Sequence, residues 1–503
     1  MIEPLEIELK LEIDPVDRRR LLSAPPLADA AGESRHLVST YFDTPARDLL
    51  AAGFSLRVRR SGKRRIQTVK AVGDPSAGLY VRPEWERTVE DDQPRFDAGC
   101  GPIVGAVGME VLGRIEPIFV TDMRRVTYRI EREGVSIDLA VDNGTIRAGE
   151  RTDRICEIEL ELRQGSSRAL FDLARQLSER VPLRLGVRSK SERGYALAGG
   201  NACEGIKPEP IPLDRNGDAG TAFQVIAQAC LRHFRLNEGL LIRADAAEPL
   251  HQARVALRRL RSLLTLYRPL LADGGPPASL RAGLRSLAAD LGEVRNIDVL
   301  IRRFGDHPQD RLIAAREAAF AHARTTLASA RTRRLMIDLV EWLAIGSWRS
   351  GSADPEGLDR HVVPFARDLL DRQHRRVKRG GKELARLGRR HRHQLRIEAK
   401  RLRYAAEFFA SLYAGKKAHR RYERFAAALE RLQGRLGELN DIAIGSRILA
   451  TCGLDTRQPK SGKRRRRRLL DDAAQAYDEL MRTKRFWHAA EARPGRDTRA
   501  PGR

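Results

Sequence analysis

Residues 5–13 read LEIELKLEI, and this stretch decides the fold of the first part of the chain. In an extended strand neighbouring side chains point to opposite faces, so Glu6, Glu8 and Lys10 share one face while leucine and isoleucine fill the other. Glutamate and lysine are depleted in strands, so a wholly charged strand face needs an explanation of its own. The stretch predicts a strand that separates an apolar layer from a charged space.

The same two-residue alternation recurs up to about residue 200. It is seen in FSLRVRR at 54–60, RIQTVK at 65–70, EWERTVE at 84–90, VTYRIERE at 126–133 and ICEIELEL at 155–162. An antiparallel sheet with one wet face is the simpler interpretation. The alternative is a closed barrel with its charged face inward, because some strands carry only acids and others only bases. Its lumen would offer carboxylates to divalent cations and arginine or lysine to phosphates. The pattern alone leaves both interpretations open.

The charge of the chain is divided unevenly. Lys and Arg number 93 against 67 Asp and Glu, a net charge of +26. The first 200 residues hold 32 basic and 32 acidic side chains, whereas the rest hold 61 and 35 and carry the whole excess. A Gly- and Pro-rich segment between them is typical of a linker. We therefore expect a first domain at 1–203, a linker at 204–219, a helical domain at 220–490 and a disordered tail at 491–503.

The helical part contains an internal repeat. HQARVALRRLRS at 251–262 returns as HQLRIEAKRLRY at 393–404, 142 residues later. A second pair, LGEVRNIDVL at 291–300 and LGELNDIAI at 436–444, is separated by 145 residues. Two independent matches at nearly the same spacing indicate a duplication, with repeats at about 220–350 and 360–490. Each repeat is long enough for a bundle of about four helices.

Both histidine helices carry a stripe of cations on one face. Offsets of 0, 3, 7 and 10 fall on one side of a helix, and the opposite side is apolar. A solvated helix face is the ordinary explanation, but such faces usually mix charges of both signs. These stripes carry positive charge only, so their side chains repel one another. An anionic partner explains them better, and two stripes facing a shared groove would converge on one ligand. The stripe residues are His251, Arg254, Arg258, Arg261, His393, Arg396, Lys400 and Arg403.

Several classes of protein are not indicated. The first residues do not form a signal peptide, and no apolar run reaches about 18 residues, so we expect neither export nor a membrane partner. The five cysteines are scattered without CxxC pairs, which favours a reducing cytoplasm over disulfides or a cysteine-rich zinc site. No P-loop and no GxGxxG motif is present. The expected location is cytoplasmic.

The motifs of the first part resemble a known family in their order along the chain. They are YFDTP at 41–45, LRVRR at 56–60, QTVK at 67–70, EWE at 84–86, the Asp142-Asn143-Gly144 turn, EIELEL at 157–162 and SKSERGYAL at 189–197. With the EIELK opening, they resemble the CYTH domain of the triphosphate tunnel metalloenzymes over about 1–200. The two histidine helices resemble the CHAD domain, the conserved-histidine α-helical domain, over about 220–490. The basic run at 463–468 belongs to neither signature.

The resemblance implies an α+β multidomain protein. It implies an eight-stranded antiparallel barrel enclosing a tunnel with flanking helices, followed by an all-α duplicated bundle. By matching position, Glu6, Glu8, Asp142, Glu157 and Glu159 would bind metal, with Mg²⁺ or Mn²⁺ as the cofactor. Lys10, Arg57, Arg59, Lys70, Arg125 and Lys190 would bind triphosphate, and Glu6, Glu8, Lys10 and Lys70 would serve catalysis. Glu84, Glu86 and Glu161 are secondary assignments, and the choice between Arg124 and Arg125 stays open.

The expected function is metal-dependent hydrolysis of inorganic triphosphate, joined to inorganic polyphosphate binding by the cationic stripes. A nucleoside or thiamine triphosphatase, or an adenylate cyclase-like enzyme, is the enzymatic alternative, although aromatic residues are only 5% of the chain and a purine pocket would need them. A non-catalytic polyphosphate-targeting protein is another alternative. Nucleic acid would also respond to the basic half, but no aromatic residues alternate with the stripes to stack on bases, which disfavours it.

Overall fold

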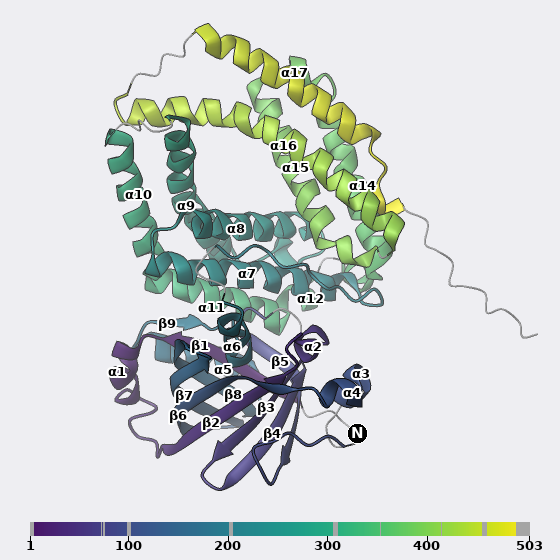
Figure 1. The fold of residues 1–503 in the computed structure, drawn as a ribbon. Coiled ribbons are helices and arrows are strands. Elements are labelled where there is room, and N and C mark those ends of the chain that lie inside the picture. The colour runs from purple at the N-terminus through teal and green to yellow at the C-terminus, as the bar shows by residue number, and fades with distance from the viewer. Residues whose placement is uncertain are drawn as a thin grey trace, which may run out of the picture.

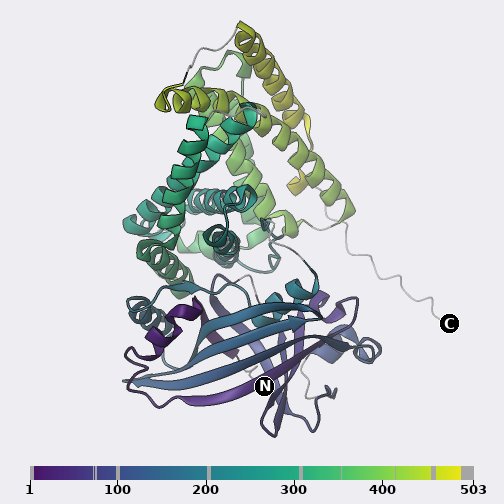
Figure 2. The same cartoon turned by 60° about the vertical axis from the view of Figure 1, so that its left-hand side comes forward.

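The computed structural model describes residues 5–71, 73, 76–97, 102–200, 205–304, 310–352, 354–413, 415–454 and 460–488. A β-barrel formed by the first part of the chain lies below an arch of helices formed by the second part (Figure 1). In the view turned by 60° the helical part again lies above the barrel, whose strands run across the picture beneath it (Figure 2). The predicted disordered tail at 491–503 lies outside the described residues.

The barrel is closed and antiparallel. Its strand order is β5-β4-β3-β2-β6-β7-β8-β1, and β1 pairs with β5 to complete the circle. This closure confirms the barrel and excludes the open sheet with one wet face. A short ninth strand, β9 (Leu183–Leu185), pairs with β1 outside the circle. The barrel strands are β1 (Leu5–Ile13), β2 (Glu33–Asp43), β3 (Phe54–Ser61), β4 (Arg64–Ala71), β5 (Leu79–Thr88), β6 (Glu116–Arg132), β7 (Val135–Ala148) and β8 (Arg151–Gln164).

The apolar face of the barrel points outward onto helices. Leu9 and Leu11 of β1 are fully buried, in one cluster with Leu170 and Phe171 of helix α5 (Arg168–Ser178). That cluster continues into the helical part, so barrel and helices share apolar packing. With the apolar side covered, the charged side of each strand faces the lumen. The remaining helices of the first part are α1 (Arg18–Leu22), α2 (Asp48–Ala51), α3 (Ile103–Val107), α4 (Met109–Leu112) and α6 (Lys190–Ala198).

The helical part repeats a unit of four helices. The order α7 to α10 returns as α14 to α17, and the histidine motifs lie on α8 and α15. Asp218 and His361 cap the first helix of each unit and form a β-bridge with each other. The helices are α7 (Ala219–Arg243), α8 (Ala247–Tyr267), α9 (Ala278–Phe304), α10 (Asp310–Ala328), α11 (Ala330–Ile345), α12 (Ser347–Ser350), α13 (Pro355–Asp359), α14 (Val362–Gly380), α15 (Arg389–Phe408), α16 (Lys416–Thr451) and α17 (Lys460–Arg482).

The segment that joins the two parts is extended but attached. Residues 205–213 form no helix or strand, and the Ile206 amide donates to the Asn237 side chain at 2.9 Å. Ile211 and Leu213 are buried against the helices. The segment therefore adds to the packing of the helical part. Over the ranges that the structure describes, no helix combines the length and apolar character needed to cross a membrane.

His233 of α7 makes the stability of the helical part sensitive to acid. Its Nε2 donates to the Ile206 carbonyl at 2.9 Å, and burial, with the charge of Arg259, lowers its pKa to about 4. Between pH 6.5 and 4 the unfolded chain binds a proton that the folded chain does not, so stability falls as pH falls through this window. We expect His233→Gln to remove about 2 kcal/mol of the decline between pH 7 and 5.

Urea unfolding followed by tryptophan fluorescence at both pH values measures this effect. His419→Gln is the matched control, because His419 is exposed on α16. An equal pH dependence in the wild type and His233→Gln would contradict the assignment.

Candidate functional sites

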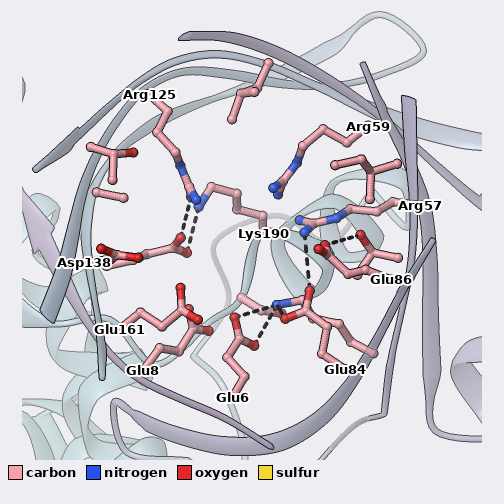
Figure 3. A pocket seen from close by; sticks show the side chains of 18 of the residues that line it. Glu6, Glu8, Arg57, Arg59, Glu84, Glu86, Arg125, Asp138, Glu161 and Lys190 are labelled. Carbon is pink, nitrogen blue, oxygen red and sulfur yellow. Dashed lines mark hydrogen bonds and ion pairs between the residues drawn. The ribbon is translucent and has the colours of Figure 1, made fainter. Parts of the chain in front are cut away.

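The barrel encloses a charged cavity of about 780 Å³. Figure 3 shows Glu6, Glu8, Glu84 and Glu161 toward one wall and Arg57, Arg59, Arg125 and Lys190 toward the other. Lys70 and Arg82 lie among the carboxylates of the first wall. Nine of the residues predicted from the motifs line this cavity, together with the secondary assignments Glu84, Glu86 and Glu161. The nine are Glu6, Glu8, Lys10, Arg57, Arg59, Lys70, Arg125, Glu159 and Lys190. Arg124 is exposed and does not line the cavity, which resolves the choice in favour of Arg125.

The two glutamates of the opening motif are held by cations from neighbouring strands. Lys70 Nζ lies 2.7 Å from Glu6 Oε2, and Arg82 contacts Glu8 at 2.8 Å and Glu6 at 3.3 Å. Glu8 and Arg82 are both buried. The sequence interpretation missed Arg82, although it shares a strand face with Glu84 and Glu86 and that spacing was the available signal.

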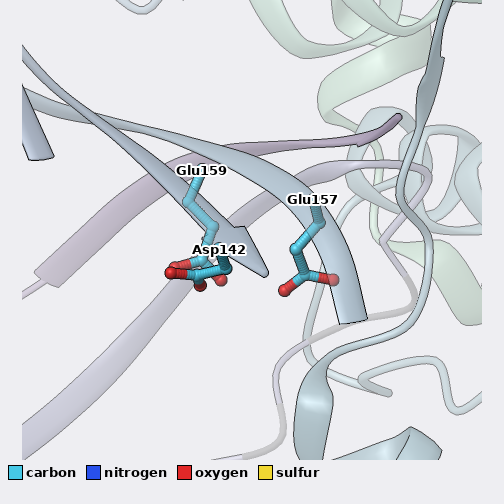
Figure 4. Close-up of side chains that lie close together, drawn as sticks. All are labelled: Asp142, Glu157 and Glu159. Atoms are coloured by element: carbon cyan, nitrogen blue, oxygen red, sulfur yellow. The ribbon is translucent and has the colours of Figure 1, made fainter. Parts of the chain in front are cut away.

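Three other carboxylates form a separate cluster. One oxygen from each of Asp142, Glu157 and Glu159 lies within 4.8 Å of the others (Figure 4). Lys190 Nζ lies 2.7 Å from Asp142 and 2.9 Å from Glu159, and it also contacts Glu157. Arg125 makes a second pair of bonds to Asp142, at 2.6 and 2.7 Å. Although burial opposes it, these cations lower the pKa of Asp142 to about 2.

The five predicted metal ligands therefore fall into two groups. Glu6, Glu8 and Glu159 line the cavity, whereas Asp142 and Glu157 are buried, do not line it and contact Lys190. Glu161 faces Glu8 across the β1–β8 pair. Burial, together with the charges of Glu6, Glu8 and Glu84, raises its pKa to about 7.

Carboxylate oxygens are the donors that Mg²⁺ and Mn²⁺ prefer. Both groups offer such donors: Glu6 and Glu8 beside Glu161, and the cluster of Asp142, Glu157 and Glu159. In both groups lysine and arginine side chains already pair with carboxylates, so a cation would replace part of that pairing.

On the opposite wall Arg57 and Arg125 reach carboxylates, whereas Arg59 does not. Arg59 bonds to the Ser39 hydroxyl at 3.4 Å, and within the described residues no carboxylate forms an ion pair with it. Burial, with the charges of Arg57 and Arg125, lowers the pKa of Arg59 to about 10. Arg57 is also buried, and its nearest carboxylate oxygen, on Glu84, is 3.7 Å away. An uncompensated buried cation is costly unless an anion binds, so this wall is suited to an anionic ligand.

In the helical part the two cationic stripes converge over half of their length. Arg258 of α8 donates to the Tyr404 hydroxyl of α15 at 3.2 Å. Burial and the charges of Arg396, Arg258 and Arg254 together lower the pKa of Lys400 to about 6. Burial and neighbouring arginines likewise lower the pKa of Arg254 to about 10. Arg254, Arg258, Arg396 and Lys400, from here on the stripe cluster, therefore form one concentration of positive charge between the two repeats.

The other stripe residues do not join the stripe cluster. Arg403 is paired with Glu407 at 2.8 Å, and Arg261 lies beside Arg285. His393 is exposed, 3.4 Å from Asn440. His251 is half-buried, and burial with the charge of Arg295 lowers its pKa to about 4, so it is neutral at pH 7.

The second repeated motif supplies residues that sequence reasoning left without a role. Arg295 and Asn440 occupy equivalent positions in that motif, and each lies beside the histidine of its own repeat. Gly292 lies against Arg254, because a Cβ at this position would come within 2.7 Å of the guanidinium. The glycine of LGEVRN thus leaves room for a stripe arginine. That this motif repeats together with the histidine motif was the sequence signal that the two lie close together.

Comparison with protein families agrees with this architecture. Residues 4–195 match the model of the CYTH domain, and residues 225–450 match that of the CHAD domain. The chain is therefore a CYTH domain followed by a CHAD domain, as the sequence motifs predicted.

Individual relatives match one part of the chain each. An inorganic triphosphatase of Haemophilus influenzae is 32% identical over 197 residues, which cover 38% of this chain and 54% of that protein. The chain thus spans about half the length of this curated relative. The CHAD domain of the plant Ricinus communis is 28% identical and covers 58% of this chain and 99% of its own, with a TM-score of 0.43. A putative adenylyl cyclase from Hippeastrum, described as having a dominant triphosphatase activity, is 20% identical and covers 39% of this chain and 97% of its own, with a TM-score of 0.31.

Lys190→Gln tests the electrostatic account of the buried trio. Removing one partner of a buried ion pair leaves uncompensated charge, so we expect a loss of about 3 kcal/mol in barrel stability when metal is chelated. Millimolar Mg²⁺ should recover part of this loss, because the trio then lacks its ammonium group. Thermal unfolding with EDTA or Mg²⁺ measures both effects, and Lys63→Gln on the exposed β3–β4 turn is the control. The account is wrong if Mg²⁺ stabilises wild type and Lys190→Gln equally.

Proposed function

We propose that the barrel hydrolyses inorganic triphosphate with the help of Mg²⁺ or Mn²⁺. The observation that carries the proposal is the division of one enclosed cavity into a wall of carboxylates and a wall of cations that includes Arg59. Arginine binds phosphate oxygens in a bidentate manner, and lysine acts as a point charge. Arg57, Arg59 and Arg125 would thus hold a chain of phosphates along one wall, with Lys10, Lys70 and Lys190 beside it.

A cavity with carboxylates toward one wall and arginines toward the other suits phosphoryl transfer, in which positioning and charge neutralisation provide most of the catalysis. When bound at Glu6 and Glu8, a divalent cation supplies Lewis-acid stabilisation of phosphate charge and a water of lowered pKa. Water attacks the terminal phosphorus, the bond to the bridging oxygen breaks, and phosphate and pyrophosphate leave. Glu161, which lines the cavity and faces Glu8 across the β1–β8 pair, would lie within reach of the attacking water as a carboxylate acceptor for its proton.

The alternative substrates differ in what they require of the cavity. A nucleoside or thiamine triphosphate, or cyclisation of ATP, needs a surface for a flat ring. Among the residues that the structure describes, Tyr41 is the one aromatic side chain lining the cavity, and Arg57 contacts its hydroxyl at 3.5 Å. This composition favours inorganic triphosphate. A purely polyphosphate-targeting protein without catalysis would not need the acidic wall.

Glu6→Gln combined with Glu8→Gln should lower the turnover of tripolyphosphate at least a hundredfold, because both carboxylates that would hold the metal are lost. Phosphate release from tripolyphosphate, ATP and thiamine triphosphate, each with Mg²⁺ and Mn²⁺, is the measurement. Because Arg82 loses both partners, circular dichroism must confirm that the barrel is folded. Arg124→Gln, on the outside of the same barrel, is the control. Near-normal turnover in the folded double variant would contradict the metal assignment.

We also propose that the helical domain binds inorganic polyphosphate through the stripe cluster. Burial and the neighbouring arginines lower the pKa of Lys400 to about 6 and that of Arg254 to about 10, so the cluster holds like charges that repel one another. A bound polyanion relieves this repulsion. The organisation proposed for the whole chain is a catalytic unit at 1–203, a junction at 204–219 and a polyphosphate-binding unit at 220–490. A cytoplasmic location, with polyphosphate granules as a candidate, follows from this proposal.

Substituting all four members of the stripe cluster with Gln should weaken polyphosphate binding at least a hundredfold. The dependence of log Kd on log salt should also become shallower by about 3, because fewer phosphates are neutralised. Arg261→Gln with Arg403→Gln is the matched control, since both lie on the same two helices but outside the stripe cluster. Fluorescence titration with labelled polyphosphate at several salt concentrations measures both quantities. Equal losses of polyphosphate affinity in the two variants would mean that the total charge of the two helices governs binding, rather than the close approach of the four stripe-cluster residues.

A further inference from the structure

The helical domain contacts the connection that carries Lys190 into the cavity. Arg232 of α7 is buried, and its guanidinium donates to the Val187 carbonyl and contacts Glu192 at 2.5 Å. Arg235, one turn later, is also buried and donates to the Leu185 carbonyl at 2.9 and 3.2 Å. Two arginines of the second domain therefore hold both ends of one segment of the first domain, residues 185–192, from here on the Lys190 connection.

The Lys190 connection has little freedom of its own. The Gly186 amide donates to the Lys10 carbonyl at 2.8 Å, which joins the connection to the opening motif. Ser189 and Glu192 form a capping box, so the same Glu192 that contacts Arg232 also starts helix α6. Lys190 is the first residue of that helix, and its ammonium group lies among Asp142, Glu157 and Glu159.

We infer that Arg232 is a positioning residue for the tunnel, supplied by the helical domain. It acts through Val187 and Glu192 to set the start of α6 and thereby the place of the Lys190 ammonium group. This inference rests on the proposed triphosphatase function. A displacement of about 1 Å in a group that positions substrate can cost about a hundredfold in rate. The CHAD domain would then be part of the catalytic unit as well as a binding module.

The domain interface offers a matched control. Arg175 of α5 also crosses it, to Glu341 at 2.5 Å and Asp338 at 3.1 Å of α11, but it does not contact the Lys190 connection. If the interface merely holds two domains together, Arg175→Gln and Arg232→Gln will have similar effects. If Arg232 positions Lys190, only Arg232→Gln will change the cavity.

The experiment uses the full chain and two readouts. The first is kcat and KM for tripolyphosphate with Mg²⁺, where Arg232→Gln should lower kcat at least tenfold and Arg175→Gln less than twofold. Arg232→Lys keeps one charged donor and should recover part of the rate. The second readout is the acetylation rate of Lys190 by acetic anhydride, followed by mass spectrometry. It should rise at least fivefold in Arg232→Gln alone, since Lys190 is only 5% exposed in the native arrangement.

The two readouts separate the possible failures. If the wild type releases no phosphate from any triphosphate, the proposed function fails, and the acetylation result alone decides the inference about Arg232. Equal kcat in wild type and Arg232→Gln, or equal acetylation of Lys190 in both, overturns the inference. Equal changes in Arg232→Gln and Arg175→Gln also overturn it, because the effect then belongs to the interface as a whole.

A second, independent observation concerns a groove between α16 and α17 of the helical domain. A cavity of about 870 Å³ lies between the start of α16 and the end of α17, and no carboxylate lines it. Arg431 is paired with Glu479 and Arg421 bonds to the His488 carbonyl. Over the described ranges, no ion pair involves the remaining six cations, which are Lys416, Lys417, Arg420, Arg424, Arg482 and Lys484.

The geometry points to a second site for a linear phosphate chain in this groove. Lys417, Arg420 and Arg424 recur at helical spacing along α16, which places them over roughly 10 Å of one helix face. A flexible chain with one charge per phosphate can follow such a row. No aromatic side chain lines the groove to stack on bases, so we commit to polyphosphate rather than single-stranded nucleic acid. This proposal deepens the polyphosphate part of the proposed function.

Lys417→Gln, Arg420→Gln and Arg424→Gln are combined in the full chain, with and without the stripe-cluster substitutions. Labelled polyphosphate binding should weaken at least tenfold in the stripe-cluster background, and its salt slope should fall by about 2. The control triple is Arg464→Gln, Arg466→Gln and Arg467→Gln, three exposed cations at the other end of α17. An equal effect of the control triple, or equal competition by duplex DNA at the same charge concentration, overturns the site. An effect of the stripe-cluster substitutions without any effect of the groove triple leaves the proposed function standing and removes the groove.

Discussion

Charge enclosed in a closed barrel is the constraint on which the rest of this structure depends. Moving a carboxylate or an ammonium group out of water costs several kcal/mol, and the cost is met only if each charge finds partners. Lys190 alone contacts three carboxylates, and Arg82 contacts two. Because the charged face of every strand is turned inward, the apolar face must be covered from outside. Helix α5 and the helical domain provide part of that cover, and the short helices of the first part provide the rest.

The sequence predicted those features that follow from a strict repeat. Alternation in LEIELKLEI determines which side chains share a face, and closure then places Glu6, Glu8 and Lys10 in the cavity. The duplicated motifs likewise predicted two histidine helices. The ion pairs within the cavity were not predictable, because they depend on strand register and on side chains from elements far apart in the chain. Lys190 reaches Asp142 across 48 residues, and Arg82 reaches Glu6 across 76.

The same limit explains why the stripes were only partly right. Helical periodicity places Arg261 and Arg403 on the same face as Arg254 and Arg396, but two helices that cross are close over only part of their length. Beyond the crossing, Arg403 pairs with Glu407 one turn later on its own helix, an i,i+4 pair that the sequence itself contains. The two copies have also diverged. His251 is half-buried beside an arginine, whereas His393 is exposed beside an asparagine, so the duplicated helices are no longer equivalent.

The two domains treat buried cations in opposite ways, and this difference has a functional consequence. In the barrel nearly every cation has a carboxylate within reach, and Arg59 is the exception. In the stripe cluster Lys400 is crowded by Arg254, Arg258 and Arg396, and burial together with these charges lowers its pKa to about 6. A compensated site keeps its shape without ligand and can discriminate among ligands by geometry. A site of uncompensated cations is destabilised until an anion arrives, so it responds to charge density more than to shape. That contrast suits a selective triphosphate tunnel joined to a module for polyphosphate chains of varied length.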